Sequence, residues 1–183
     1  MMERIRQALK NPSLRVRLLM ALAALAACAL LLGALCAAAM LARVSFLERS
    51  SGDYEIYLAD WLQKLAGGSF AEGMRQNIGE YNVLYQYILF VITRLPVPSL
   101  YAVKAVSFIG DAFLAGAAAT LAQKDGKKSA VAFGLALLLP TVVLNGALWG
   151  QCDSVYAALA VLSVYLVLSG HPLLGVVSIG ASF

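Results

Sequence analysis

Two polar segments interrupt a chain that is otherwise dominated by leucine, alanine and valine, and both carry carboxylates. The first segment, SGDYEIYLADWLQKLAGG at residues 51–68, contains Asp53, and the second, NGALWGQCD at residues 145–153, ends on Asp153. An unpaired carboxylate can accept a proton from a hydroxyl group and act as a general base. The two segments are therefore candidates for the walls of one site that binds a polar substrate.

The first segment also has a structural interpretation. Ser50 and Asp53 match the serine-x-x-acid capping pattern that opens a helix. The helix would end at Gly67-Gly68 and lie on the membrane surface, with three leucines on one face: Leu58, Leu62 and Leu65. Glu55 follows Asp53 by two residues, so a helix does not bring both acids to one face, and at most one of them acts.

The second segment is explained only in part as a loop that exposes its backbone, with Trp149 as an interfacial anchor. This interpretation leaves Gln151 and Asp153 unexplained, because Asp153 begins an apolar run and acids near membrane spans are costly. Asp111 is a third such acid, and Lys104 lies close enough along the chain to pair with it. The sequence leaves open whether Asp111 is functional or structural.

The composition is that of a membrane protein. Of the 183 residues, 61% are hydrophobic and 13% are charged, and the mean hydropathy is +0.79. The net charge of +4 does not indicate nucleic acid, because the basic residues gather at the ends of apolar runs. The three cysteines show no metal-binding spacing, and a single histidine excludes a His-centred triad or a multi-His metal cluster.

The apolar runs predict an all-α, polytopic helical bundle with its spans at about 18–42, 100–122, 129–144, 154–169 and 173–183. Residues 43–99 form an outer segment with amphipathic interfacial helices, one of them over 82–95. Five basic residues precede the first span, namely Arg4, Arg6, Lys10, Arg15 and Arg17. With the basic loop KDGKK at 124–128, they predict a cytoplasmic N-terminus and place both polar segments outside.

The last run, 173–183, covers about 16 Å at 1.5 Å per residue, which is half of a bilayer. The sequence therefore predicts that the chain is the N-terminal part of a longer protein, or alternatively an inactive truncated fragment. Chemistry at the outer membrane face suits a lipid-linked phosphate substrate, whose phosphate a basic side chain would hold. The candidates for that role are Arg75, Arg94 and Lys104.

Three blocks carry a resemblance to a known family: SGDYEIYLADW, GEYNVLYQYILFVITRLPVPSLYAVKAVSFIGD and LLPTVVLNGALWGQCDSVYAAL. From about residue 43 onward the chain resembles the N-terminal half of bacterial membrane proteins grouped with the GPI mannosyltransferases, in the GT-C superfamily. LNGALWGQCDS is the most specific of the motifs. The Gly-Asp-Tyr-Glu piece is also similar to the first-outer-loop motif of the glucosyltransferases that build the N-glycan precursor.

The resemblance implies a glycosyltransferase of the plasma membrane, for mannose or a related hexose, that acts with inversion and without a metal or cofactor. It would move the sugar from a polyprenyl-phosphate donor to a hydroxyl group of an unknown glycan, lipid or protein. Asp53 matches the catalytic acid, and the expected substrate-binding residues are Tyr54, Glu55, Lys104, Trp149, Gln151 and Asp153. One departure is YNVLY at 81–85, where related sequences usually have Tyr-Asn-Pro-Pro.

A transporter or lipid flippase is the alternative from another class, with Asp111 and Asp153 as proton- or substrate-coupling acids. Such a protein predicts an internal repeat, which these 183 residues do not show. It also gives no role to the long amphipathic outer segment.

Overall fold

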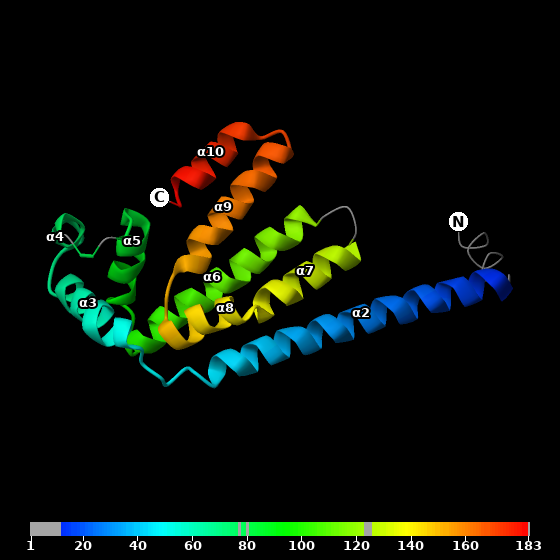
Figure 1. Ribbon diagram of the computed structural model, residues 1–183, viewed down its shortest axis with the longest axis horizontal. Coiled ribbons are helices and arrows are strands. Elements are labelled where there is room, and N and C mark those ends of the chain that lie inside the picture. The colour runs from blue at the N-terminus through cyan, green and yellow to red at the C-terminus, as the bar shows by residue number, and fades with distance from the viewer. Residues whose placement is uncertain (1–11, 77, 80, 123–125, 183) are drawn as a thin grey trace.

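The computed structural model describes residues 12–76, 78–79, 81–122 and 126–182. Within these ranges the chain forms helices and no strand, which confirms the all-α prediction (Figure 1). The elements are α2 (Pro12–Val44), the π-helix η1 (Tyr54–Leu58), α3 (Ala59–Ala66), α4 (Phe70–Arg75), α5 (Val83–Ile92), α6 (Ser99–Leu121), α7 (Gly126–Leu138), α8 (Pro140–Val143), the π-helix η2 (Leu144–Trp149), α9 (Asp153–Leu168) and α10 (Pro172–Gly180).

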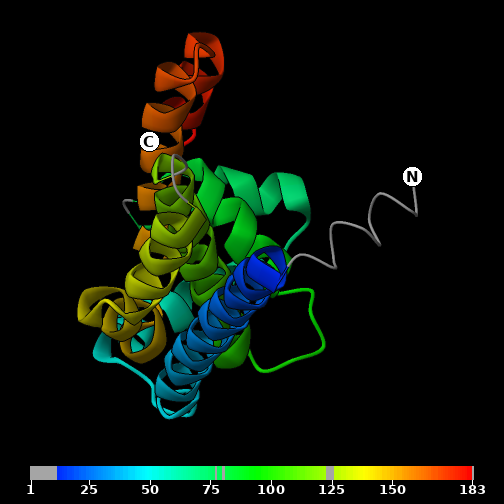
Figure 2. The ribbon, with the colours of Figure 1, turned by 90° about the vertical axis from the view of Figure 1, so that its right-hand side faces the viewer.

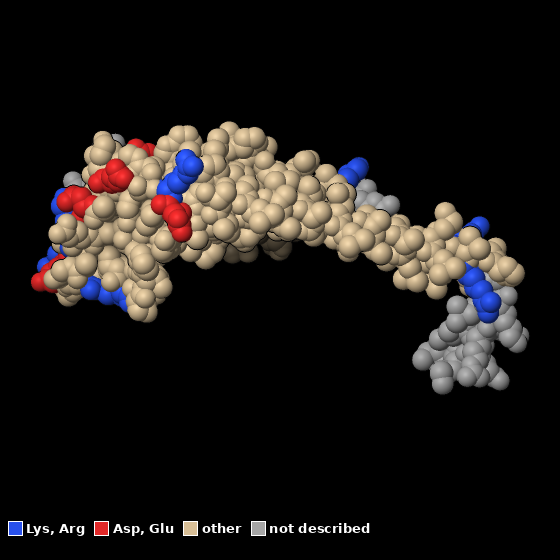
Figure 3. All heavy atoms as spheres, turned by 90° about the horizontal axis from the view of Figure 1, so that it is seen from below, with Lys and Arg blue, Asp and Glu red and all other residues tan. Residues whose placement is uncertain are grey.

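Two of the described helices, α2 and α6, are long and apolar enough to cross a membrane. They contain the predicted spans at 18–42 and 100–122 almost entirely. The charged residues on the face shown in Figure 3 gather at one end of the molecule, over the outer helices, and are few from there to the start of α2, where most of the surface carries no charged side chain. This distribution is the one expected of a protein whose middle lies in lipid.

The third predicted span, 129–144, is bent. α7 ends at Leu138, and Pro140 begins the next helix because proline lacks the backbone N–H that a continuous helix needs. The two parts, Lys128–Leu138 and Pro140–Trp149, meet at 49° and would make one broken span or a re-entrant loop. The structure also differs from the predicted loop at 145–153, because the helix continues through η2 to Trp149.

α6 is the centre of the bundle, with α7 on one side and α9 on the other (Figures 1 and 2). α2 packs against α7, and α10 packs against α9 at the opposite side of the bundle. α10 begins at Pro172, as the sequence predicts. Two serine hydroxyl groups hold it against α9: Ser163 donates to the carbonyl of Gly175 at 2.8 Å, and Ser178 donates to the carbonyl of Leu159 at 2.7 Å.

The outer segment forms a small core together with the start of α6. The three leucines predicted to share a helix face, Leu58, Leu62 and Leu65, are all buried. They pack against the buried face of α5 and against Val103 near the start of α6. The apolar face of the predicted surface helix is therefore covered by protein, and this packing fixes α3 over the end of the bundle.

A buried ion pair ties four helices together beneath the outer segment. The guanidinium of Arg43 donates to one oxygen of Asp111 from Nη2 at 2.6 Å and from Nε at 2.9 Å. The hydroxyl of Ser154, in α9, donates to the other oxygen at 2.6 Å. Arg43 also donates to the carbonyls of Ala39 and Leu137. Asp111 thus pairs with Arg43, and the predicted alternative of a Lys104–Asp111 pair is not what the structure shows.

Some residues behind the predicted orientation lie outside the described residues, namely Arg4, Arg6, Lys10, Lys124 and Asp125. Among the described elements, the end of α6 and the start of α7 lie toward the end of the molecule from which α2 begins (Figure 1). The end of η2 and the start of α9 lie at the opposite end, beside α3.

Candidate functional site

The two polar segments are in contact although 98 residues separate the paired positions. The hydroxyl of Ser51 donates to the carbonyl of Trp149 at 2.9 Å. The amide Nε2 of Gln151 donates to Oδ2 of Asp53 at 2.9 Å. The structure therefore brings together Asp53 and Gln151, the two residues on which the predicted site depends, and a second hydrogen bond, from the side chain of Ser51 to the backbone of Trp149, holds the two segments beside each other.

The start of the first segment is capped by Ser51, one residue later than the sequence predicts. Its hydroxyl accepts a hydrogen bond from the backbone N–H of Tyr54 at 3.1 Å, which satisfies a donor that a helix start leaves free. The hydroxyl of Ser50 instead donates to the carboxylate of Glu55 at 2.5 Å. Because Ser51 both caps this helix and binds Trp149, it places Asp53 beside the second segment.

A π-helix occurs in each of the two segments. In η1 the N–H of Ala59 donates to the carbonyl of Tyr54, and in η2 the N–H of Gly150 donates to the carbonyl of Asn145. Short π-helical turns are rare in proteins, and those that occur are often located at functional sites. Gly150 ends η2 with a φ of 71°, a left-handed conformation that favours glycine. This turn reverses the chain and leads Gln151 toward Asp53.

The orientation of the Gln151 amide follows from its two partners. A carboxylate only accepts hydrogen bonds, so the amide nitrogen must face Asp53. The amide oxygen then faces the phenol of Tyr81, whose hydroxyl group donates to it at 2.6 Å. Tyr81 thus holds Gln151 in the rotamer that contacts Asp53, provided that the phenol keeps its proton.

Tyr81 keeps that proton over the physiological range. Burial raises the pKa of Tyr81 to about 12, and the negative charges of Asp153 and Asp53 add to this effect. Since the pKa in the folded state is above that of a free tyrosine, the folded state binds the proton more tightly than the unfolded state does. The resulting stability is complete below about pH 10 and is lost as the pH rises toward 12.

When the pH is raised from 9.5 to 11.5, we expect the thermal midpoint of the protein in detergent to decrease. The decrease should be smaller for Tyr81→Phe than for the parent. The phenylalanine variant has no proton to lose at this position, so one cause of the alkaline loss of stability is removed. Circular dichroism at a series of pH values measures both proteins. An equal alkaline fall in the two proteins would contradict the assignment of a raised pKa to Tyr81.

Asp153 lies close to this group and has a different partner. The amide nitrogen of Asn145 donates to its Oδ2 at 3.0 Å. Asp153 is the first residue of α9, where the helix dipole favours a negative charge. Its place at an exposed helix start explains how an acid can begin an apolar helix.

Three adjoining hollows surround these side chains. One of about 590 Å³ is lined by Asp53, Tyr57, Leu58, Trp61, Gly79, Tyr81 and Gln151. A second of about 360 Å³ is lined by Asp53, Tyr81, Asn145, Trp149, Gln151 and Asp153. The third, of about 540 Å³, is mainly apolar and is lined by Leu114, Pro140, Thr141, Val142, Leu144, Asn145, Trp149, Asp153, Ser154 and Ala157. The second hollow shares lining residues with each of the other two, so the three adjoin one another, and Asp53 borders the first two.

Three other predicted site residues lie away from these hollows. The phenol of Tyr54 is hydrogen bonded to the hydroxyl of Ser99 at 2.8 Å. Glu55 is exposed, and its carboxylate accepts the hydrogen bond from Ser50. Lys104 is fully buried, and its ammonium group donates to the carbonyls of Phe46 and Arg49. In the described structure these three side chains support the outer segment and the turn after α2.

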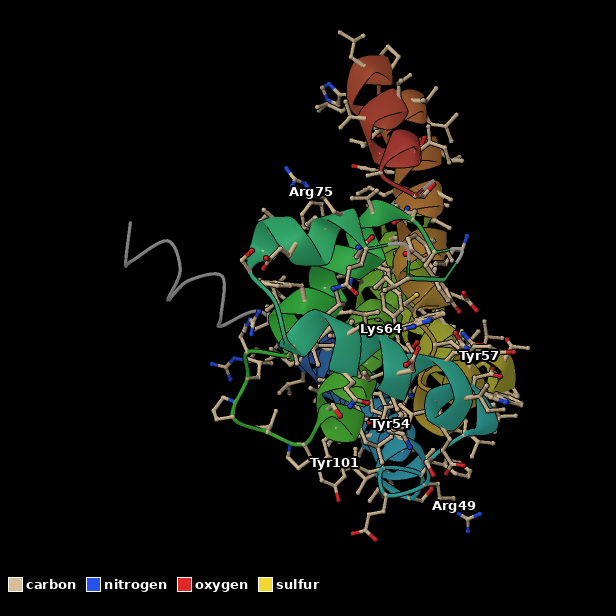
Figure 4. The ribbon with its side chains drawn as sticks, turned by 90° about the vertical axis from the view of Figure 1, so that its left-hand side faces the viewer. Arg49, Tyr54, Tyr57, Lys64, Arg75 and Tyr101 are labelled. Carbon is tan, nitrogen blue, oxygen red and sulfur yellow. The ribbon has the colours of Figure 1, made fainter. Side chains whose placement is uncertain are left out.

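The three basic residues that were predicted to hold the phosphate of the substrate also lie outside the hollows. Arg94 donates to the carbonyls of Ala66 and Gly68 and lies over the ring of Phe90. Arg75 is the last residue of α4 and lies well apart from Tyr57, as Figure 4 shows. With Lys104 bound to carbonyls, none of the three lines the hollows around Asp53. Among the described residues there is also no group of three or more His, Cys, Asp or Glu side chains that could hold a metal ion.

Sequence reasoning missed the aromatic side of the site, which consists of Tyr57, Trp61 and Tyr81. One signal was present, because residues 53, 57 and 61 recur at a spacing of four, the spacing of one helix face. It also missed Arg43, which the prediction assigned to the start of the outer segment. No signal of that kind identifies Tyr81, whose place depends on the fold.

Comparison with protein-family models, curated proteins and solved structures finds no match for the chain. The resemblance to the GT-C superfamily therefore stays a prediction, and the geometry above is what bears on function.

Proposed function

We propose that the protein is a membrane glycosyltransferase of the GT-C type, which transfers mannose or a related hexose from a polyprenyl-phosphate donor to an acceptor hydroxyl group. The single observation that supports it most is the contact between Asp53 and Gln151 in an open hollow next to an apolar one. The arrangement suits a substrate with a polar head and a lipid chain.

Asp53 has the properties of a general base. Among the described residues its carboxylate accepts one hydrogen bond, from Gln151, and pairs with no cation. The carboxylate can therefore take the proton of the acceptor hydroxyl as that oxygen bonds to C1 of the sugar. The bond from C1 to the phosphate oxygen breaks with its electron pair, so the lipid phosphate leaves and the anomeric centre is inverted.

The apolar hollow supports a lipid-linked donor. It lies between α6, α8 and α9 and shares Asn145, Trp149 and Asp153 with the hollow of about 360 Å³, the smaller of the two polar hollows that border Asp53. A polyprenyl chain in the apolar part would place its head group near the carboxylates. Trp149 lies where the apolar and polar parts meet, a position typical of tryptophan at membrane interfaces.

The proposed setting is the outer face of the plasma membrane, with a cytoplasmic N-terminus and several spans. The positions of the helix ends are compatible with this orientation, because the polar segments lie at the end of the bundle opposite to the start of α2. As a coupling acid in a transporter, Asp111 would need to change its charge or partner. Its bonds to Arg43 and Ser154 favour a structural role instead.

The test is a transfer assay on the full chain in membranes. A labelled polyprenyl-phosphate mannose is added, and release of the label from the lipid is followed over time. We expect release above that of membranes without the protein. Absence of release from mannose, glucose and arabinose donors alike would overturn the proposal, and a flux assay would then test a transporter.

A further inference from the structure

We infer that the hollow of about 590 Å³ beside Asp53 binds a hexopyranose ring of the acceptor, and so that the acceptor is a saccharide. The side chains of Tyr57, Trp61 and Tyr81 would pack against the ring. Asp53 and Gln151 would form hydrogen bonds with its hydroxyl groups. That the sugar is the acceptor rests on the proposed function, whereas sugar binding rests on the hollow alone. Its volume is in the range of small-molecule sites.

The aromatic side chains form one continuous wall. The rings of Tyr57 and Trp61 are 6.1 Å apart, and those of Trp61 and Tyr81 are 5.7 Å apart at 73°. Tyr57 is 52% exposed, so packing in a core does not explain it. The faces of aromatic rings are electronegative, and the faces of a pyranose carry C–H groups of opposite polarity. A sugar ring is therefore a fitting occupant of this wall.

The polar side chains lie at the edge of the same hollow. Asp53 offers acceptor positions that Gln151 does not use, and Gln151 is held by Tyr81 with its nitrogen toward Asp53. Hydroxyl groups both donate and accept, so a carboxylate and an amide side by side can bind two neighbouring hydroxyl groups. A purely apolar ligand would leave these groups without partners when it displaced water, which would oppose its binding.

The backbone at Gly79, which also lines the hollow, packs against the ring of Trp61. A side-chain carbon at Gly79 would lie 2.4 Å from the Trp61 ring, and the φ of Gly79 is 61°. Only glycine allows the chain to approach the indole this closely in that conformation. The wall is thus preformed, and a ring that binds to it does not need to order the indole first.

The position of the hollow identifies the sugar as the acceptor's. The apolar hollow between α6 and α9 adjoins the smaller polar hollow, which borders Asp53 from the side of Trp149 and Asp153. The aromatic hollow borders Asp53 from the side of Trp61. A lipid-linked donor that enters from the apolar side therefore reaches Asp53 through the smaller hollow, which Tyr57 and Trp61 do not line, and the general base lies at the border between the two substrates.

Fluorescence tests sugar binding without a need for transfer. The chain has two tryptophans, so Trp149→Phe leaves Trp61 as the only one. We expect methyl α-mannopyranoside or methyl glucopyranoside at millimolar concentration to change the Trp61 emission, and sorbitol, an acyclic polyol, to leave it unchanged. Tyr57→Ala in this background should weaken the response about tenfold, the loss expected for one aromatic contact.

Acceptor kinetics test the same inference in the chain with both tryptophans. Tyr57→Ala should raise the acceptor KM about tenfold and leave the donor KM unchanged. Tyr87→Ala is the matched control, because Tyr87 is exposed on α5 and stacks on Phe70 away from the hollow.

If Trp61 responds but no sugar is transferred, the sugar site stands and the proposed function falls. If sugar is transferred while Trp61 shows no response and Tyr57→Ala has the parent's acceptor KM, the inference is overturned.

Discussion

Asp53→Asn is expected to lower kcat for sugar transfer by about 10²- to 10⁴-fold, the range for loss of a general base. Asparagine has nearly the same shape, and its oxygen can still accept the hydrogen bond from Gln151. It cannot take a proton from the acceptor hydroxyl group. The loss should therefore appear in kcat, with the KM of the donor and the thermal midpoint close to those of the parent.

Asp60→Asn is the matched control for this substitution. Asp60 is in the same outer segment, is about half exposed and pairs with Lys64 at 2.6 Å on the surface of α3. Such exposed pairs contribute little, so both activity and stability should stay near those of the parent. An Asp53→Asn variant that transfers sugar as fast as the Asp60→Asn variant would exclude Asp53 as the base.

Arg43→Ala and Asp111→Ala are expected to be the most destabilising substitutions, at about 3–5 kcal/mol each. Each leaves a buried charge without its partner, since Arg43 is 2% exposed and Asp111 is fully buried. Loss of the pair also separates α2 from α6 and α9 at this point. Reversible unfolding in mixed detergent micelles, followed by circular dichroism, measures the free energy of unfolding.

The double variant Arg43→Met/Asp111→Leu separates the cost of an unpaired charge from the value of the pair. Apolar side chains of similar size leave no buried charge, so the double variant should unfold less easily than either single variant. Lys64→Ala breaks an exposed ion pair and serves as the control, with an expected loss below about 1 kcal/mol. Single variants as mild as this control would show that the buried pair does not hold the helices together.

The helices could be predicted well from the sequence because their signals are local. Apolar runs and the proline at position 172 gave α2, α6, α9 and α10 to within a few residues, except for the earlier start of α2. The face with Leu58, Leu62 and Leu65 was also predicted correctly, since a period of 3.6 residues depends only on spacing. What covers that face was not predictable in this way, because α5 and Val103 reach it only through the fold.

The sequence predicts only part of which side chains lie together at the candidate site. Asp53, Gln151 and Asp153 stand out in sequence because charged and amide groups are unexpected in an apolar chain. Tyr54 and Glu55 were expected there because of the family resemblance around Asp53, and Lys104 because a phosphate needs a cation, but each finds a partner elsewhere. Arg43 was overlooked because an arginine at the end of a span has an adequate explanation at the membrane surface.

The extra residue in each π-helix has a consequence for the register of the outer segment. A helix advances by about 100° per residue, so removal of one residue from Tyr54–Leu58 would restore α-helical bonding and turn everything before it by that angle. With Leu62 and Leu65 still anchored in the core, Asp53 would point away from Gln151. The same holds for Leu144–Trp149 and the residues after it. The two segments thus meet only when both turns carry their additional residue, so the chain length within each turn is itself part of what aligns the site.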